Sequence, residues 1–368
     1  MNEVYHIPAM LQETIEGLNI KPEGLYVDVT FGGGGHSRAI LEAISSQQSA
    51  VSSQQSAISN QQSAVRSQES AVSSQESAVS SQQSGVRSQQ SAISQGHLYS
   101  FDQDKDALRN GIEDERWTFV HSNFRYLKNW MDYYGVEAID GLLADLGVSF
   151  HHFDCPERGF SFRFSAPLDM RMNQTAKRTA ADIINGYSEE ELAKLFWLYG
   201  ELKNGRGIAK NICKARAGKP IERTEELVAA AFKLKESELL GGNRNPGEEL
   251  NIPTNAKKDL AKLFQALRIE VNDEMGALRE MLVAARDLLK PGGRIAILTY
   301  HSLEDRLVKN FLRSGNLEGT IEKDFYGNIL TPFTLIEKGR EASDEEVERN
   351  PRARSAKLRV AEKVQMKN

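Results

Sequence analysis

A run of four glycines directly after a short apolar segment constrains the fold of this chain more than any other feature. The segment 25–29 is apolar apart from Asp28, and it leads into Gly32–Gly35. Consecutive glycines let a backbone turn sharply and approach a ligand closely, because they carry no side chain. A helix that starts at Ser37 would present free N–H groups and its positive dipole end to an anionic group. The pattern predicts a nucleotide-like cofactor at the carboxyl edge of a parallel sheet.

The spacing of the glycines narrows the choice of cofactor. The dinucleotide fingerprint G-x-G-x-x-G fails, because Ser37 or Arg38 occupies the place of its third glycine. A P-loop fails too, since His36 stands where a lysine must follow the last glycine. An acidic residue just before the loop, Asp28, suits S-adenosylmethionine (SAM), whose amino group favours a nearby carboxylate and whose carboxylate favours backbone N–H groups. A glycine-rich turn without a ligand is the alternative.

Composition excludes several classes of protein. The chain has 368 residues, enough for one large or two ordinary domains. No apolar run approaches the roughly 18 residues of a membrane span, and the first residues lack a secretion signal. Cys155 and Cys213 are too few and too far apart for a disulfide framework or a metal site, so we expect a cytoplasmic protein without metal. The net charge of −5 argues against indiscriminate nucleic-acid binding, yet it leaves room for basic patches.

A tandem array with a seven-residue period occupies residues 45–95, and its unit is Ser-Ser-Gln-Gln-Ser-Ala-Val. When Val or Ile is placed at position a of a heptad, glutamine falls at position d and removes half of the coiled-coil seam. An odd period cannot keep one face of a strand apolar either. We therefore expect a low-complexity insertion that is disordered or marginally helical. A self-associating coiled coil is the alternative.

Excluding this array restores a spacing that cofactor binding requires. In nucleotide-binding α/β folds, an acidic residue ends the second strand about 20 residues after the glycine loop and holds the ribose hydroxyls. Asp102 follows the segment 96–101 and lies 68 residues after Gly34, of which the repeats 45–93 account for 49. The remaining 19 residues match the expected spacing. Asp102 is therefore the predicted ribose ligand, and the array is an insertion away from the ligand-binding edge.

Three further strands are predicted, and two of them end in reactive side chains. The segments 116–121 and 139–149 are the third and fourth strands, and Asp145 lies near the carboxyl end of the fourth. A buried acid without a role is unfavourable, so Asp145 is a candidate site residue. A long amphipathic helix is expected over 256–289, then a strand over 294–300 that leads into His301, a second candidate.

The segment 153–256 changes character and predicts helices over 188–197, 207–216 and 224–234. Ser188 and Thr224 are the expected N-caps of the first and third helices. The same segment carries a basic stripe that suits a phosphate backbone, with solvated helix faces as an equal alternative. Its members are Lys203, Arg206, Lys210, Lys214, Arg216, Lys219 and Arg223. A basic tail follows at 349–357, with an edge strand expected over 358–361.

These elements together predict an α/β, Rossmann-like SAM-methyltransferase fold with a mostly parallel, doubly wound sheet. Residues 1–152 and 257–368 would form the methyltransferase core. Residues 153–256 would form an inserted all-helical domain for substrate recognition, and 45–95 the repeat insertion.

Eight motifs, in order along nearly the whole chain outside the repeats, resemble those of the RsmH (MraW) family. They occupy residues 5–8, 31–37, 145–149, 157–162, 167–172, 264–272, 301–306 and 350–355. Members of this family are bacterial SAM-dependent methyltransferases that methylate cytosine N4 in the decoding centre of small-subunit (16S) ribosomal RNA. The resemblance implies a SAM site made by Gly34, Gly35, His36, Asp102, Phe124 and Asp145, the last near the methyl group.

The chain departs from the family pattern in two places. The family commonly has a Ser-Ser-x-Gln run after the fourth strand, and His152 takes the place of that glutamine as the implied cofactor contact. In the helical segment, Leu202–Gly205 follows Tyr199–Glu201 where an acidic, basic and aromatic run is common. RNA contacts carried over from the family to that segment are therefore not assigned.

The implied reaction is a direct, in-line methyl transfer to an exocyclic amine, without a cysteine nucleophile. Asp145 is the leading acceptor of the amine proton and His301 the second, and the target base must be unstacked to reach the site. Two alternatives stay open: the same fold acting on DNA or a small amine, and a non-catalytic interaction protein organised by the repeats. The sequence leaves the assembly state open, with a homodimer as one alternative.

Overall fold

The computed structural model describes residues 8–45, 96–148, 152–153, 155–241, 247 and 249–365. The repeat array, apart from its first residue, lies outside the described residues, and so do the expectations about its conformation. Within the described ranges, no helix is both long enough and apolar enough to cross a bilayer.

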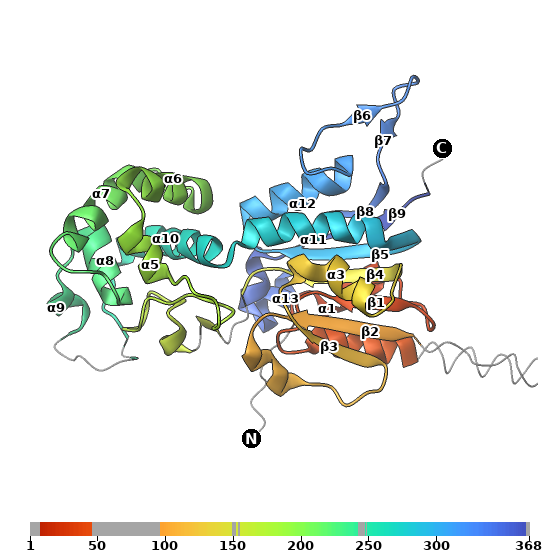
Figure 1. Ribbon diagram of the computed structural model, residues 1–368, viewed down its shortest axis with the longest axis horizontal. Helices are drawn as coiled ribbons and strands as arrows, with labels where there is room; N and C mark the ends of the chain where they lie inside the picture. The colour runs from red at the N-terminus through yellow and green to blue at the C-terminus, as the bar shows by residue number, and fades with distance from the viewer. Residues whose placement is uncertain are drawn as a thin grey trace, which may run out of the picture.

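A seven-stranded sheet forms the core, in the order β3-β2-β1-β4-β5-β9-β8 (Figure 1). The first five strands of this order are parallel, β9 is antiparallel to β5, and β8 is antiparallel to β9. The strand order reverses at β1, and ligands of doubly wound sheets bind beside that point. The strands are β1 (Leu25–Asp28), β2 (His97–Asp102), β3 (Trp117–His121), β4 (Ile139–Asp145), β5 (Leu289–Thr299), β8 (Phe333–Glu341) and β9 (Lys357–Lys363).

Helices cover both faces of the sheet, which confirms the predicted α/β fold class. Buried side chains of α3, α11 and α12 pack on one face with Val27, Leu142 and Ile295. Side chains of α1 and of the helix over 35–45 pack on the other face with Tyr26 and Leu98. Besides the helix over 35–45, the α-helices of this part of the molecule are α1 (Leu11–Leu18), α3 (Leu127–Tyr133), α11 (Glu274–Leu288), α12 (Ser302–Ser314) and α13 (Asp344–Arg349).

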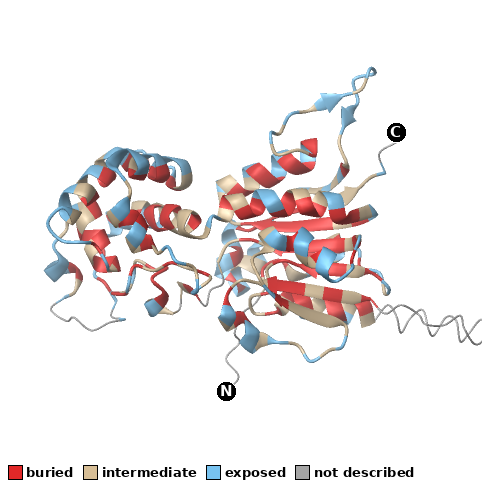
Figure 2. Cartoon of the chain, viewed as in Figure 1, coloured by how far each residue is buried: buried red, intermediate tan, exposed pale blue. Residues whose placement is uncertain are grey.

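A separate helical layer lies beside the sheet and has its own apolar core, visible as the red faces in Figure 2. Residues such as Phe196, Ile212 and Leu263 fill this core. Its helices are α5 (Ala180–Gly186), α6 (Glu189–Gly200), α7 (Gly205–Arg216), α8 (Thr224–Phe232), α9 (Glu236–Leu239) and α10 (Thr254–Asn272). The predicted N-cap at Ser188 is confirmed, because its side chain and Glu191 form a reciprocal capping box.

Three predictions about local structure are wrong. The single helix expected over 256–289 is two helices, α10 and α11, which meet at Asp273 in the left-handed conformation (φ 47°). Thr224 is not an N-cap: Arg223 holds that place, while the Thr224 hydroxyl donates to the carbonyl of Phe164 at 2.6 Å. The strand expected at the edge, β9, lies between β5 and β8.

The break at Asp273 has a consequence for packing. Leu260, Leu263 and Leu267 of α10 belong to the helical core, whereas Leu278 and Leu282 of α11 pack on the sheet. The helical layer therefore continues beyond residue 256, and the α10–α11 junction connects it to the helices that pack on the sheet.

Candidate active site

A cavity of about 310 Å³ lies at the carboxyl ends of β1, β2, β4 and β5. All of the predicted site residues line it except Gly34 and Asp28. The glycine loop, the ends of four strands, helix α10 and the basic tail all contribute to its wall. The lining includes Gly32, Gly33, Gly35, His36, Asp102, Phe124, Asp145, His152, Gln265, Arg268, Tyr300, His301, Arg352 and Ser355.

The glycine loop has the backbone geometry that only glycine adopts easily. Gly32 and Gly34 have φ values of 50° and 75°. A Cβ on Gly34 would lie 2.9 Å from the ring of Phe31, and a Cβ on Gly35 would lie 2.8 Å from Pro8. The following helix begins at Gly35, two residues earlier than predicted. Gly34 thus shapes the turn, while its neighbours form the cavity wall.

Asp102 ends β2 and ties the glycine loop to the sheet. One carboxylate oxygen accepts the N–H of Gly32 at 2.9 Å, and the other accepts the N–H of Asp104 at 2.8 Å. Burial raises the pKa of Asp102, and these two N–H donors oppose that rise. Asp102 also lines the cavity, and its contact with the ribose hydroxyls stays a prediction.

Asp28 does not have the position that the sequence suggested. Its side chain is fully buried and does not line the cavity. Its carboxylate accepts the hydroxyl of Ser37 at 2.6 Å and the N–H of Thr30 at 3.0 Å. Burial raises the pKa of Asp28, against these donors. Asp28 therefore holds the two ends of the glycine loop through Thr30 and Ser37. It is not the acid that was expected near the amino group of SAM.

Asp145 ends β4 and lines the cavity, where one neighbour bonds its carboxylate and another bonds its backbone N–H. Its Oδ1 accepts the phenolic hydroxyl of Tyr300 at 2.6 Å, and its own N–H donates to Thr30 Oγ1 at 2.6 Å. Burial and the adjacent carboxylate raise the pKa of Tyr300 well above its ordinary value, so the phenol stays protonated and remains a donor. Tyr300 was not among the predicted site residues, although it directly follows β5 and precedes His301.

His36 faces the same carboxylate as a neutral ring. Its Nε2 lies 3.2 Å from the carbonyl oxygen of Ala9, which can only accept, so Nε2 carries the proton. Burial lowers the pKa of His36, with the charge of Asp28 opposing this effect. Nδ1 therefore carries no proton, and it lies 3.7 Å from Asp145 Oδ2. His36 adds no positive charge beside Asp145.

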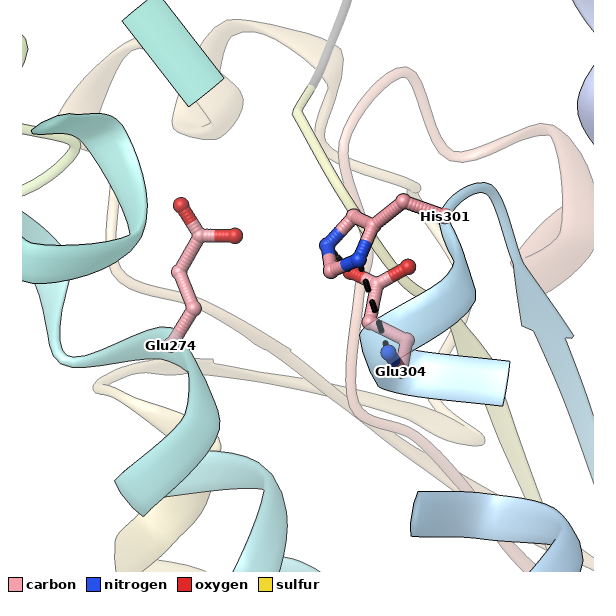
Figure 3. A group of neighbouring side chains, drawn as sticks. All are labelled: Glu274, His301 and Glu304. Atoms are coloured by element: carbon pink, nitrogen blue, oxygen red, sulfur yellow. Dashed lines mark hydrogen bonds and ion pairs between the residues drawn. The ribbon is translucent and has the colours of Figure 1, made fainter. Parts of the chain in front are cut away.

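His301 is the N-cap of α12 and stands beside two glutamates (Figure 3). Its Nδ1 accepts the N–H of Glu304 at 3.4 Å, and its Nε2 lies 3.0 Å from Glu304 Oε1. Among the described residues, ligand atoms of Glu274, His301 and Glu304 lie within 4.8 Å of one another. Arg268 donates to both oxygens of Glu274, at 2.8 and 3.0 Å, so a cation is already part of this group.

Glu304 remains ionised within this group. Burial opposes its ionisation, but the neighbouring His301 and the charge of Arg268 together hold the pKa of Glu304 below its ordinary value. Its Oε2 accepts the N–H of Tyr300 at 3.0 Å. Glu304 therefore fixes the backbone that carries both Tyr300 and His301.

His152 lies in the cavity wall and is buried. Its Nε2 is 2.6 Å from Asp104 Oδ2, which also accepts a hydrogen bond from Arg158 at 2.9 Å. Burial works against the ionised form of Asp104, yet these partners hold the pKa of Asp104 at about 2. His152 is thus held against the 104–106 turn at the place where a cofactor contact was predicted.

The residues around the cavity fit SAM. The backbone of Gly33 and the start of the helix at residue 35 offer N–H groups to a carboxylate. Asp102 offers acceptors to ribose hydroxyls, and Phe124 offers an apolar face to adenine. A cavity of about 310 Å³ is at the lower end of the range for small-molecule sites.

Comparison with known proteins agrees with this geometry. The model of the MraW methylase family matches residues 3–93 and 84–364. A protein named ribosomal RNA small subunit methyltransferase H from Phocaeicola vulgatus is 49% identical, over 98% of each chain. Proteins of the same name from Parabacteroides distasonis and Flavobacterium johnsoniae are 50% and 43% identical, again over 98% of each chain.

Proposed function

The chain belongs to the MraW methylase family, and we propose that it transfers the methyl group of SAM to N4 of a cytosine in the decoding centre of 16S rRNA. The coarser activity, SAM-dependent methylation of small-subunit ribosomal RNA, follows from full-length similarity to relatives with that name. The observation that supports the finer proposal is the single cavity in which the glycine loop meets Asp145 and His301.

Bound SAM supplies an electrophilic methyl group on its sulfonium. The remaining tasks belong to the protein. The N4 lone pair of cytosine is delocalised into the ring, so the site must hold the amine in line with the methyl group and accept its hydrogen bonds. A carboxylate accepts such bonds at two oxygens. Asp145 is at the cavity wall, Tyr300 orients its carboxylate and Thr30 fixes its backbone, which suits it to this task.

Transfer forms the N4–methyl bond and breaks the sulfur–methyl bond. The amine then carries one proton too many, and we assign its acceptance to Asp145. His301 lines the same cavity from the end of β5 and is the second candidate. The backbone of Gly33 and the carboxylate of Asp102 would hold the cofactor's polar groups, and Phe124 its adenine.

The target base has to enter the cavity from a structured RNA. Gln265 and Arg268 of α10, together with Arg352 and Ser355 of the tail, also line the cavity. An unstacked cytosine would therefore reach Asp145 between the helical layer and the tail. A ribosomal substrate also implies action in the cytoplasm.

A panel of substrates tests the proposal. Purified protein is incubated with SAM and with small ribosomal subunits, naked 16S rRNA, duplex DNA or free cytidine, and the methylated nucleoside is identified by mass spectrometry. The proposal predicts N4-methylcytidine at one decoding-centre position of the ribosomal substrate. Methylation only of DNA or free cytidine, or of another atom, would contradict it.

A further inference from the structure

A row of four cations, here called the α7 row, runs from the α6–α7 turn along α7. Its members are Lys203, Arg206, Lys210 and Lys214, and all four are exposed. None of them has an ion pair or hydrogen bond with another described residue. No acidic residue occurs between Leu202 and Pro220. The row is therefore a positive surface within a chain of net charge −5.

The other three members of the basic stripe have structural roles. Arg216 donates to the carbonyl oxygens of Ile184 and Tyr187. Lys219 pairs with Glu226, and Arg223 pairs with Glu225 at 2.6 Å. The structure thus separates cations that hold the helical layer together from those of the α7 row, which the sequence alone could not separate.

The spacing of the row suits a polyanionic strand. Arg206, Lys210 and Lys214 are four residues apart on one helix face, so one positive charge recurs about every 6 Å over about 12 Å of helix. Charges along a nucleic-acid strand recur at distances of the same order.

An exposed tryptophan accompanies the row. Trp197 on α6 is 67% exposed, which is unusual for so large an apolar side chain. α6 and α7 pack against each other, and Gly205 at the start of α7 lies against the backbone of Trp197. The outer faces of both helices are exposed in Figure 2. Aromatic side chains beside cations are stacking platforms for unpaired bases.

The row begins near the cavity. Glu201, in the turn before Lys203, accepts a hydrogen bond from the hydroxyl of Ser302 at 3.2 Å. Ser302 follows His301, which lines the cavity. A strand whose base occupies the cavity would therefore meet the first cations of the row as it leaves.

We propose that the α7 row and Trp197 bind the rRNA strand that flanks the target cytosine. The cations contact its phosphates, and the indole of Trp197 stacks on an unpaired base. The inference rests on the proposed function, because it takes the ligand to be the ribosomal RNA substrate. An acidic surface of a ribosomal protein is the competing partner.

The test compares two sets of variants in the full-length protein. Arg206→Gln, Lys210→Gln and Lys214→Gln are combined, and Lys219→Gln is the control because it removes an exposed but paired lysine. Affinity for a 16S rRNA fragment containing the decoding centre is measured without SAM over a series of salt concentrations, and SAM affinity is measured by calorimetry. For the triple variant, the plot of log K against log salt should be less steep: the magnitude of its negative slope should fall by about 2, at about 0.7 for each lost contact. SAM affinity should stay unchanged in both variants.

Trp197 has its own pair of variants. Trp197→Ala should weaken RNA affinity by about 5- to 150-fold, as expected for one lost base stack, and Trp197→Phe should retain most of it. An unchanged salt slope in the triple variant would overturn the inference. So would a triple variant that loses affinity only for assembled subunits and keeps it for the RNA fragment, because that result assigns the row to a protein partner. RNA binding is measured without methylation, so the two proposals can fail separately. If the wild-type protein binds RNA through the α7 row but methylates an atom other than cytosine N4, the proposed function is refuted and the inference about the row stands.

Discussion

Replacement of Tyr300 by phenylalanine isolates one hydrogen bond at the centre of the proposed site. The phenol donates to Asp145 Oδ1 at 2.6 Å, and its raised pKa keeps it protonated throughout the working pH range. Phenylalanine keeps the ring that packs beneath the cavity and removes only the hydroxyl. The change therefore tests whether the orientation of Asp145 matters for catalysis, separately from the presence of its carboxylate.

The size of the effect follows from the type of bond. A hydrogen bond to a charged group contributes about 1.5–3 kcal/mol. If all of it serves to orient Asp145 in the transition state, kcat should fall by about 10- to 150-fold. The lost donor also favoured the ionised carboxylate, so the acid limb of the kcat profile should move to higher pH. SAM affinity should change little, because Tyr300 does not contact the glycine loop or Asp102 in the described hydrogen bonds.

The assay is steady-state methylation of small subunits at saturating SAM across a pH series, with SAM affinity measured separately by calorimetry. Tyr187→Phe is the matched control, since its hydroxyl also donates to a carboxylate, that of Glu270, at 2.6 Å and lies outside the cavity. The control should keep the wild-type profile. If Tyr300→Phe has a kcat within about twofold of wild type and an unmoved acid limb, its hydrogen bond has no role in the reaction.

Further predictions concern the cofactor loop and its neighbours. Asp102→Ala should raise the SAM Kd by about 10- to 150-fold in calorimetry, because an acceptor for ribose and for the loop is lost; an unchanged Kd would remove Asp102 from the site. Gly34→Ala should lower Tm and weaken SAM binding, since its φ of 75° and the contact with Phe31 strain any side chain by about 1–3 kcal/mol; a wild-type Tm would contradict this. The pKa of Asp104 is about 2, below its ordinary value, so its contribution to the free energy of unfolding is complete above about pH 4 and is lost as the pH falls toward 2. Asp104→Asn should accordingly lower the urea midpoint at neutral pH, with the difference narrowing below about pH 4, whereas a pH-independent difference would assign the loss to His152 packing alone.

The sequence predicted the position of the site because parallel strands end at a common edge. Asp102 and Asp145 were assigned to the carboxyl ends of two strands and His301 to the residues after a third, so their convergence followed from the fold class alone. Excluding the repeat insertion put Asp102 at the expected distance from the glycine loop in sequence. In the structure its carboxylate accepts the N–H of Gly32 in that loop. Local pattern and topology were sufficient for these residues.

Other features depended on contacts that no local pattern reports. Asp28 precedes the loop, but its side chain points into the core, where Ser37 satisfies it. In the sequence, Tyr300 has the pattern of an ordinary buried strand residue. Only the fold brings its hydroxyl to the carboxylate of Asp145. The helical periodicity continues across Asp273, so only the two separate cores show that α10 and α11 are different helices.

The most direct test of the central claim is single-turnover methylation of small ribosomal subunits by Asp145→Ala. SAM affinity of the same preparation is measured by calorimetry, and the methylated nucleoside is identified by mass spectrometry. The account predicts that SAM still binds while formation of N4-methylcytidine falls by at least about 100-fold, the lower range for loss of a positioned proton acceptor. Undiminished N4 methylation with SAM bound would contradict it.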